Sequence, residues 1–342
     1  MPDDSPDAVR SIGLSRTAAF GAVWVFVLVL LGAFTTSIGA GMAFPDWPLS
    51  NGSLNPTGWL GDLAMFAEHS HRLSAGLMTA ITLVIAIWGR WAEPRPWLRD
   101  LAWWAVGIIV AQALAGGLRV LLDQHQIATV GTTVGRLFAM AHACLAQVFV
   151  CALLALAAGL TPSWTGGTPA EFSPTARRWG VIGCALLLLQ LGVAAIMRHS
   201  FAGLAIPTFP WSTPEGDLLP AAWDFRVGIH FVHRLLALAL ALALPVFVVA
   251  VWRDPAAGKR VKRLAATVVA LLLLQIGLGI EAVRTFRNPQ VTTAHVLVGA
   301  LTLAATFLLS LITHRARLEK TVGTVGRPPA PAPALATQQF SA

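Results

Sequence analysis

The sequence predicts an all-α membrane protein with eight transmembrane helices, arranged as two parallel-duplicated four-helix bundles. The first of three reasons is composition: 56% of the 342 residues are hydrophobic, only 12% are charged, and the mean hydropathy is +0.69. Such values exclude an ordinary soluble globular domain. The other two reasons are the length of the apolar segments and an internal repeat.

A helix needs about 20 mainly apolar residues to cross the hydrocarbon layer of a bilayer. The chain has segments of this kind near 18–40, 64–88, 101–121, 137–160, 179–199, 226–252, 264–284 and 291–313. Each segment is continuously apolar rather than alternating, which favours helices over barrel strands.

The distribution of basic residues predicts the orientation of these spans. With the N-terminus in the cytoplasm, most of the 24 Lys and Arg residues fall in cytoplasmic segments, as the positive-inside rule requires. The expected parts are a tail at 1–17, a bundle at 18–160, a linker at 161–178, a bundle at 179–313 and a tail at 314–342, with both tails and the linker in the cytoplasm. We expect the last tail to be disordered, because it is rich in Pro, Ala and Thr. The net charge of +8 needs no nucleic-acid partner.

An internal repeat predicts the duplication. Segment 41–48 recurs at 203–210, and His-Arg-Leu at 71–73 recurs at 233–235, both at an offset of 162 residues. Each half contains four spans, an even number, so the two halves have the same orientation in the membrane and the repeat is not of the inverted kind. We expect each half to close as a four-helix bundle.

Four histidines near the starts of spans two, four, six and eight are the candidate ligands. They are His71, His142, His233 and His295. Even-numbered spans all enter the membrane from the same side, so these imidazoles are expected at one depth. Histidine inside a membrane is functional by default, and two imidazoles on facing helices can ligate one haem iron. We therefore pair His71 with His142 and His233 with His295, which predicts two haem sites.

Haem ligation has two alternatives at these histidines. A single membrane histidine is often a packed, hydrogen-bonded side chain. Zinc or copper also binds histidine, but Cys144, Cys151 and Cys184 have no metal-binding spacing.

Glu68 marks a difference between the halves. It lies one helical turn before His71 and on the same face, whereas the equivalent residue in the second half is His230. A carboxyl at membrane depth is costly unless it is protonated or paired. Beside a haem it could move protons or stabilise a cation that develops on the substrate; the alternative is simple pairing with Arg72 or another arginine.

Arg72 and Arg234 directly follow two of the candidate ligands. A guanidinium suits a haem propionate carboxylate, which predicts a cofactor-binding role. Arginines at helix ends also commonly extend to the membrane surface without any ligand.

Three sequence elements together resemble the haem A synthase family. They are Glu-His-Ser-His-Arg at 68–72, Pro-Asp-Trp-Pro at 45–48 followed by Asn-Gly at 51–52, and His-Phe-Val-His-Arg at 230–234. With the single histidines of the fourth and eighth spans, the resemblance extends over about 18–313.

The resemblance implies an oxidoreductase that converts the C8 methyl group of haem O into the formyl group of haem A, through a hydroxymethyl intermediate, for terminal oxidase assembly. His71 and His142 would hold the substrate haem, and Glu68 would be the catalytic carboxylate. His233 and His295 would ligate a permanent haem b that relays electrons. The expected location is the bacterial cytoplasmic (inner) membrane. The expected partners are a farnesyltransferase that supplies haem O, membrane lipid and a quinone or other electron acceptor; a homo-oligomer is left open.

This chain departs from many bacterial members of that family, which carry a cysteine pair around the Pro-Asp-Trp-Pro loop. Here the flanking positions are Phe44 and Ser50, so no disulfide can form there. The main alternative function is a quinone-linked di-haem b-type cytochrome. Its common form places two histidines on one helix, whereas here each helix offers one. A transporter would not need four level histidines, and its repeat would more often be inverted.

Overall fold

A computed structural model describes residues 6–128, 131–165 and 169–325. The elements are α1 (Pro6–Ser37), α2 (Leu63–Ala92), α3 (Pro96–Leu121), β1 (Gln126–Ile127), β2 (Thr132–Thr133), α4 (Val134–Gly159), α5 (Pro162–Thr165), α6 (Pro174–His199), α7 (Phe225–Trp252), α8 (Lys259–Arg284) and α9 (Pro289–Val325). Within these ranges, eight helices are long and apolar enough to cross a membrane. The prediction of an all-α membrane protein with eight spans is confirmed.

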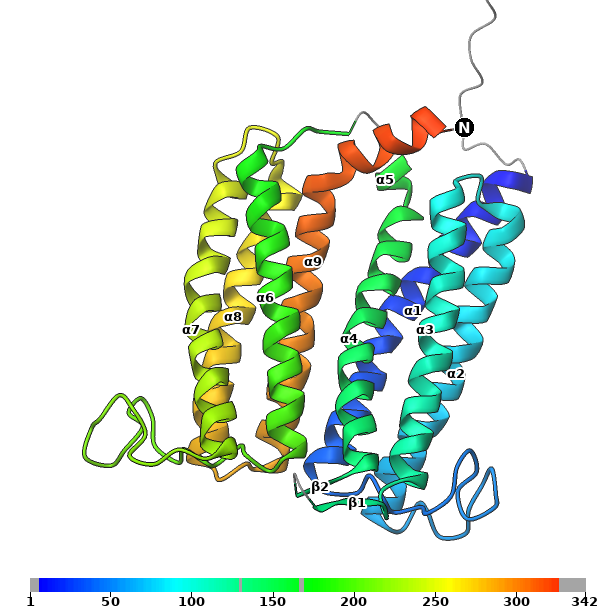
Figure 1. Cartoon of the computed structure of the whole chain (residues 1–342). Coiled ribbons are helices and arrows are strands. Elements are labelled where there is room, and N and C mark those ends of the chain that lie inside the picture. Colours follow the sequence, from blue (N-terminus) through cyan, green and yellow to red (C-terminus); the bar gives the residue numbers. More distant parts are fainter. Residues whose placement is uncertain (1–5, 129–130, 166–168, 326–342) are drawn as a thin grey trace, which may run out of the picture.

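The helices of each half contact one another. Helices α1 to α4 form one group and α6 to α9 the other, and the two groups stand side by side (Figure 1). Between the groups, α1 contacts α9, α4 contacts α6, and α4 contacts α9. In the predicted repeat, α1 corresponds to α6 and α4 to α9. The contacts α1–α9 and α6–α4 are therefore equivalent, which is compatible with the predicted duplication.

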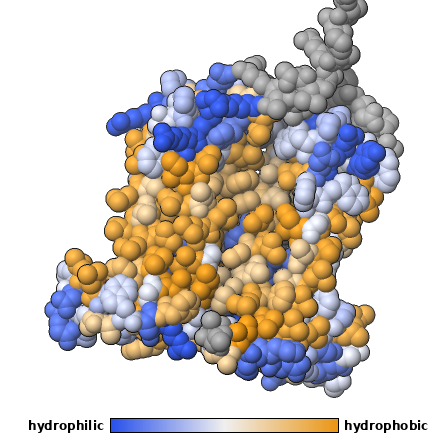
Figure 2. Space-filling view, viewed as in Figure 1, coloured by the Kyte–Doolittle hydropathy of each residue, from blue (hydrophilic) through white to orange (hydrophobic). Residues whose placement is uncertain are grey.

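The two ends of the molecule differ. The long loops at 38–62 and 200–224 and the short β1–β2 hairpin lie at one end, whereas α5 and the start of α6 lie at the other (Figure 1). We call the end with the long loops the loop end. Figure 2 shows a broad apolar belt between two polar rims, as expected for a protein surrounded by lipid.

Each half has its own apolar core. Leu14, Met78, Ile85, Phe149 and Leu153 are among the buried residues of the first core. The second core includes Phe172, Leu244, Phe247, Leu303 and Leu309. Small residues allow the close approach of helices that membrane packing requires: a Cβ atom on Gly180 of α6 would lie 2.7 Å from Ser310 Oγ of α9.

Several boundaries differ from those expected. Helix α1 begins at Pro6, inside the predicted tail at 1–17, and α5 lies within the predicted linker. Helix α9 continues to Val325, so residues 314–325 are helical, where a disordered tail was expected; residues 326–342 lie outside the described residues. Two contacts of Arg315 stabilise the extension of α9. Arg315 pairs with Glu319 at 3.1 Å, and its guanidinium carbon lies 5.4 Å from the ring centroid of Trp164 in α5.

Candidate functional site

The start of α2 holds the first long loop through Glu68. This side chain is buried, with 4% of the residue exposed. Its Oε2 accepts hydrogen bonds from the backbone N–H of Ala43 at 2.6 Å and of Phe44 at 3.2 Å, and its Oε1 pairs with Arg72 at 2.5 Å. Glu68 therefore connects the first long loop to α2 through three contacts. The pairing with Arg72, one of the two roles that the sequence allows for Glu68, is therefore present.

Arg72 and Arg234 bind the two long loops in the same way. Arg72 donates to the carbonyl oxygens of Phe44, Asp46 and Leu49 at 3.4, 2.8 and 2.6 Å. Arg234 donates to those of Ile206, Thr208 and Trp211 at 2.9, 2.6 and 3.3 Å. The three acceptors of each arginine occupy equivalent positions of the repeat. The structure thus directs both guanidinium groups at loop carbonyls, and their predicted contact with a cofactor stays a prediction.

His230 takes the position of Glu68 in the second half. It is 3% exposed, and its Nδ1 accepts a hydrogen bond from the backbone N–H of Ile206 at 3.3 Å. Ile206 is the repeat equivalent of Phe44, so the two halves anchor the same loop position with different chemistry. The first half uses a charged carboxylate and the second an imidazole.

Asp46 stabilises the turn in the first loop. Its carboxylate accepts hydrogen bonds from the backbone N–H of Asn51 at 2.8 Å and of Gly52 at 2.7 Å. Both residues have positive φ angles, 51° and 70°, and glycine adopts such a conformation without steric cost. Burial raises the pKa of Asp46, but these hydrogen bonds outweigh it and bring the pKa below its ordinary value.

His71 and His142 face each other across the first half. Their ring centroids are 6.4 Å apart, and the ring planes are inclined at 78°. A metal–imidazole bond is about 2.0–2.1 Å long, so two nitrogens on opposite sides of one ion lie roughly 4 Å apart. The remainder of the centroid–centroid distance is the distance from each nitrogen to the centre of its own ring. The separation of the two rings is therefore compatible with one shared metal ion.

Gln112 of α3 orients His142. The Nδ1 atom of His142 lies 2.9 Å from the Gln112 carbonyl oxygen, and the Gln112 side chain donates to the His142 carbonyl oxygen at 2.9 Å. A bond at Nδ1 fixes the ring and leaves Nε2 for a ligand, which is the usual arrangement of a metal-binding histidine.

His233 and His295 form the corresponding pair in the second half. The two rings lie within electrostatic range of each other. The amide nitrogen of Gln190 lies 3.5 Å from His233 Nε2, and that of Gln275 lies 3.3 Å from His295 Nε2. In the described part of the chain, the Nδ1 atoms of both histidines have no hydrogen-bond partner. Buried ring nitrogens without partners are costly, and a bound group could engage these pairs.

Glycines face three of the four rings. A Cβ atom on Gly32 would lie 2.8 Å from His71, and one on Gly116 would lie 3.1 Å from His142. The same construction on Gly279 gives 3.1 Å to His295. Any larger residue at these positions would displace the rings, so the glycines keep space for the imidazoles. The donor set and this space fit a group held between two imidazoles in each half.

The four histidines lie at matched distances from the loop end of their helices. The side-chain caps of α2, α4 and α7 are Asp62, Thr133 and Asp224. In each of these helices the candidate ligand follows its cap by nine residues, about 13 Å along the axis. In α9, Asn288 accepts hydrogen bonds from the first-turn N–H groups, and His295 follows it by seven residues. The expected common depth is therefore present to within about one helical turn.

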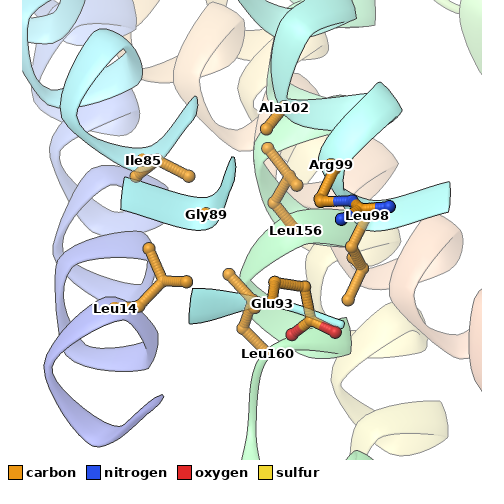
Figure 3. A pocket seen from close by; sticks show the side chains of 9 residues that line it. All are labelled: Leu14, Ile85, Gly89, Glu93, Leu98, Arg99, Ala102, Leu156 and Leu160. Atoms are coloured by element: carbon orange, nitrogen blue, oxygen red, sulfur yellow. The ribbon is translucent and has the colours of Figure 1, made fainter. Parts of the chain in front are cut away.

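A small crevice at the opposite end is not part of this site. It encloses about 190 Å³, part of which is open to solvent. Apolar residues such as Leu14 and Leu98 line it together with Glu93 and Arg99 (Figure 3). Glu93 is engaged by Arg95 at 2.6 Å. Within the described residues, no group of three or more His, Cys, Asp or Glu side chains could hold a metal ion.

The sequence missed some of the residues around the histidines. Gln112 and Gln275 lie 163 residues apart, close to the repeat offset of 162, and this spacing is a signal that could have marked them. Their contacts with His142 and His295 were not predicted. Gln190 gave no such signal.

Comparison with known proteins identifies the family of this chain. Residues 62–307, which include the four histidines, match the family model described as cytochrome oxidase assembly protein, COX15-CtaA. The Heme A synthase of Alkalihalophilus pseudofirmus is 26% identical over 300 residues, which cover 86% of this chain and 95% of the relative. That of Shouchella clausii is 25% identical over 312 residues, covering 89% and 99%. That of Rhodospirillum centenum is 26% identical over 347 residues, covering 91% and 90%. The chain therefore belongs to the COX15-CtaA family of cytochrome oxidase assembly proteins.

Proposed function

We propose that this protein is a haem A synthase, which oxidises the C8 methyl group of haem O to a formyl group through a hydroxymethyl intermediate. The observation that carries the proposal is the facing pair of His71 and His142, 6.4 Å apart. The relatives that match over most of the chain are named Heme A synthase, which supports haem A biosynthesis as the role. The product would serve the assembly of terminal oxidases.

In the first half, His71 and His142 would bind the iron of the substrate haem O. Glu68 is the proposed catalytic carboxylate, one helical turn before His71. Its carboxyl group is held by Arg72 and by two loop N–H groups. A fixed negative charge held in a site of low dielectric can stabilise positive charge that develops on the substrate.

In the second half, His233 and His295 would hold a haem b, which would transfer electrons when bound. The imidazole of His230 replaces the carboxylate of Glu68 there, so this half lacks the proposed catalytic group. That difference supports a division of labour in which only the first half performs the oxidation. The proposed final electron acceptor is a quinone or another acceptor in the membrane.

The proposal includes a location and a supply of substrate. We infer that the protein lies in the bacterial inner membrane with both termini in the cytoplasm, which places the loop end outside. Haem O would come from a farnesyltransferase in the same membrane. A homo-oligomer is compatible with this arrangement.

Pigment analysis tests the proposed reaction. The chain is co-expressed with a haem O-producing enzyme in a host that lacks haem A, and the extracted haems are separated by chromatography. We expect haem A from the wild type and none from Glu68→Gln, while both proteins keep bound haem. Glu93→Gln is the matched control, because Glu93 is also buried and paired with an arginine but lies at the opposite end. Bound haem b without haem A would instead support a di-haem cytochrome, and haem A at the normal rate from Glu68→Gln would overturn the catalytic assignment.

A further inference from the structure

Arg198 places a positive charge at the boundary between the two halves, near the loop end of α6. Its Nη2 donates to the carbonyl oxygen of Ala33 at 2.9 Å and to the hydroxyl of Ser37 at 2.8 Å, both in α1. Ser37 also accepts a hydrogen bond from Thr293 of α9 at 3.0 Å. These partners are neutral, and none of the ion pairs among the described residues includes Arg198. Among the described residues, no carboxylate forms an ion pair with it.

Four other arginines at the loop end have identified partners. Arg72 and Arg234 bind loop carbonyls. Arg119 pairs with Asp123 at 2.9 Å, and Arg136 lies 5.0 Å from the centroid of an aromatic ring. Arg198 differs from these four arginines because it lies between α6 and α1, helices of different halves, and pairs with no carboxylate in the described part of the chain.

Two further observations indicate what the missing anion is. Arg287, in the loop between α8 and α9, interacts electrostatically with Arg198, so two like charges lie near each other. Arg198 also lies within electrostatic range of the His295 ring. Arg198 is half-buried, and a guanidinium that is partly removed from water is more stable when a carboxylate pairs with it. A carboxylate beside His295 would compensate both arginines.

We propose that Arg198, assisted by Arg287, binds a carboxylate of the porphyrin that His233 and His295 ligate. This inference rests on the proposed function, because it takes the ligand of the second half to be a haem. A haem carries two propionate carboxylates, and a guanidinium matches a carboxylate with two parallel hydrogen bonds. Arg198 also connects the halves, since the carbonyl oxygen that it binds belongs to the residue after Gly32, which faces His71.

Binding of haem and of haem dimethyl ester to the haem-free protein tests the inference. The ester keeps the iron and the ring but has no propionate charge. The full chain carries His142→Ala, which leaves the second pair as the only complete one, and is placed in nanodiscs of phosphatidylcholine, which has no net charge. The appearance of the b-type spectrum measures binding. We expect haem to bind at least about tenfold more tightly than its ester, and Arg198→Gln to reduce this ratio towards one. Arg198→Lys keeps part of the preference.

Two control variants separate the proposed role from a structural one. Arg226→Gln removes an exposed charge at the loop end of α7. Ser37→Ala removes a neutral partner of Arg198 but keeps its charge. Both are expected to preserve the preference for haem over the ester. The inference is overturned if Arg198→Gln retains the full preference, or if either control variant loses it to the same extent.

The remaining outcomes are also decisive. If haem and its ester bind equally tightly in phosphatidylcholine, and Arg198→Gln lowers the amount of phosphatidylglycerol that the protein binds from mixed nanodiscs, the anion is a lipid headgroup and the porphyrin assignment is overturned. If the His142→Ala protein binds neither haem nor the ester, the haem site of the second half is absent. In that case the proposed function fails. The absorption spectrum of the protein shows this before the affinities for haem and its ester are compared.

Discussion

Glu68→Ala should loosen the first long loop without unfolding the helices. The change removes the acceptor of two backbone N–H groups, that of the buried Phe44 and that of the half-buried Ala43. An unsatisfied buried donor costs about 1–3 kcal/mol, and the half-buried donor of Ala43 costs about 1 kcal/mol. We therefore expect the free energy of local loop opening to fall by about 2–4 kcal/mol. Since about 1.4 kcal/mol corresponds to a factor of ten, hydrogen-exchange protection of these two amides should fall by roughly 30- to 1,000-fold. Arg72 still binds the loop carbonyls, so the loop stays attached.

Hydrogen exchange followed by mass spectrometry, on protein in nanodiscs, measures this change. Glu68→Gln keeps an acceptor oxygen and should lower the protection by about tenfold or less. Glu93→Ala, which alters a buried carboxyl at the opposite end, should leave the loop amides unchanged. Protection within threefold of the wild type in Glu68→Ala would refute the role of Glu68 as the loop anchor.

Three other predictions concern the histidine pairs and the first loop. Replacing His233 or His295 by Ala should abolish the b-type absorption of the second half, and an unaltered spectrum in both variants would remove that site. Gly279→Leu should prevent ligation by His295, because a Cβ atom at this position already lies 3.1 Å from the ring. A Cβ atom on Gly277 meets nothing within 4 Å, so Gly277→Leu should bind haem normally, and equal spectra of the two variants would contradict this reasoning. Asp46 has a lowered pKa, so its contribution to loop stability is complete above its ordinary pKa of 3.8 and is lost as the pH falls through the lowered value in the folded protein. Loop exchange measured against pH should show this acid limb in the wild type and a flatter one in Asp46→Asn.

The fold could be predicted because bilayer thickness dictates a minimum length of apolar helix. All eight spans follow from hydropathy, but the ends do not, since they lie in polar segments where hydropathy carries no signal. Helix α9 shows this: its extension beyond the membrane depends on the Arg315–Glu319 pair and on contact with Trp164. Such contacts exist only after the chain has folded.

The histidine pairing could be predicted because repeat position and depth are both properties of the sequence. The loop contacts of Arg72 and Arg234 could not, because carbonyl oxygens are present at every residue and no residue type marks the ones that an arginine will bind. Arg198 gave no repeat signal either, since its equivalent in the first half is Thr36. Its neutral partners come from α1, far away in the sequence.

The matched binding of both loops by Arg72 and Arg234 has an evolutionary consequence. Each arginine closes its loop through three carbonyl groups, whatever side chain stands one turn earlier in the helix. The residue at that neighbouring position can therefore differ between the halves while the shared loop scaffold is retained. A carboxylate in one half and an imidazole in the other are thus what the exchange of one residue within this common framework would produce.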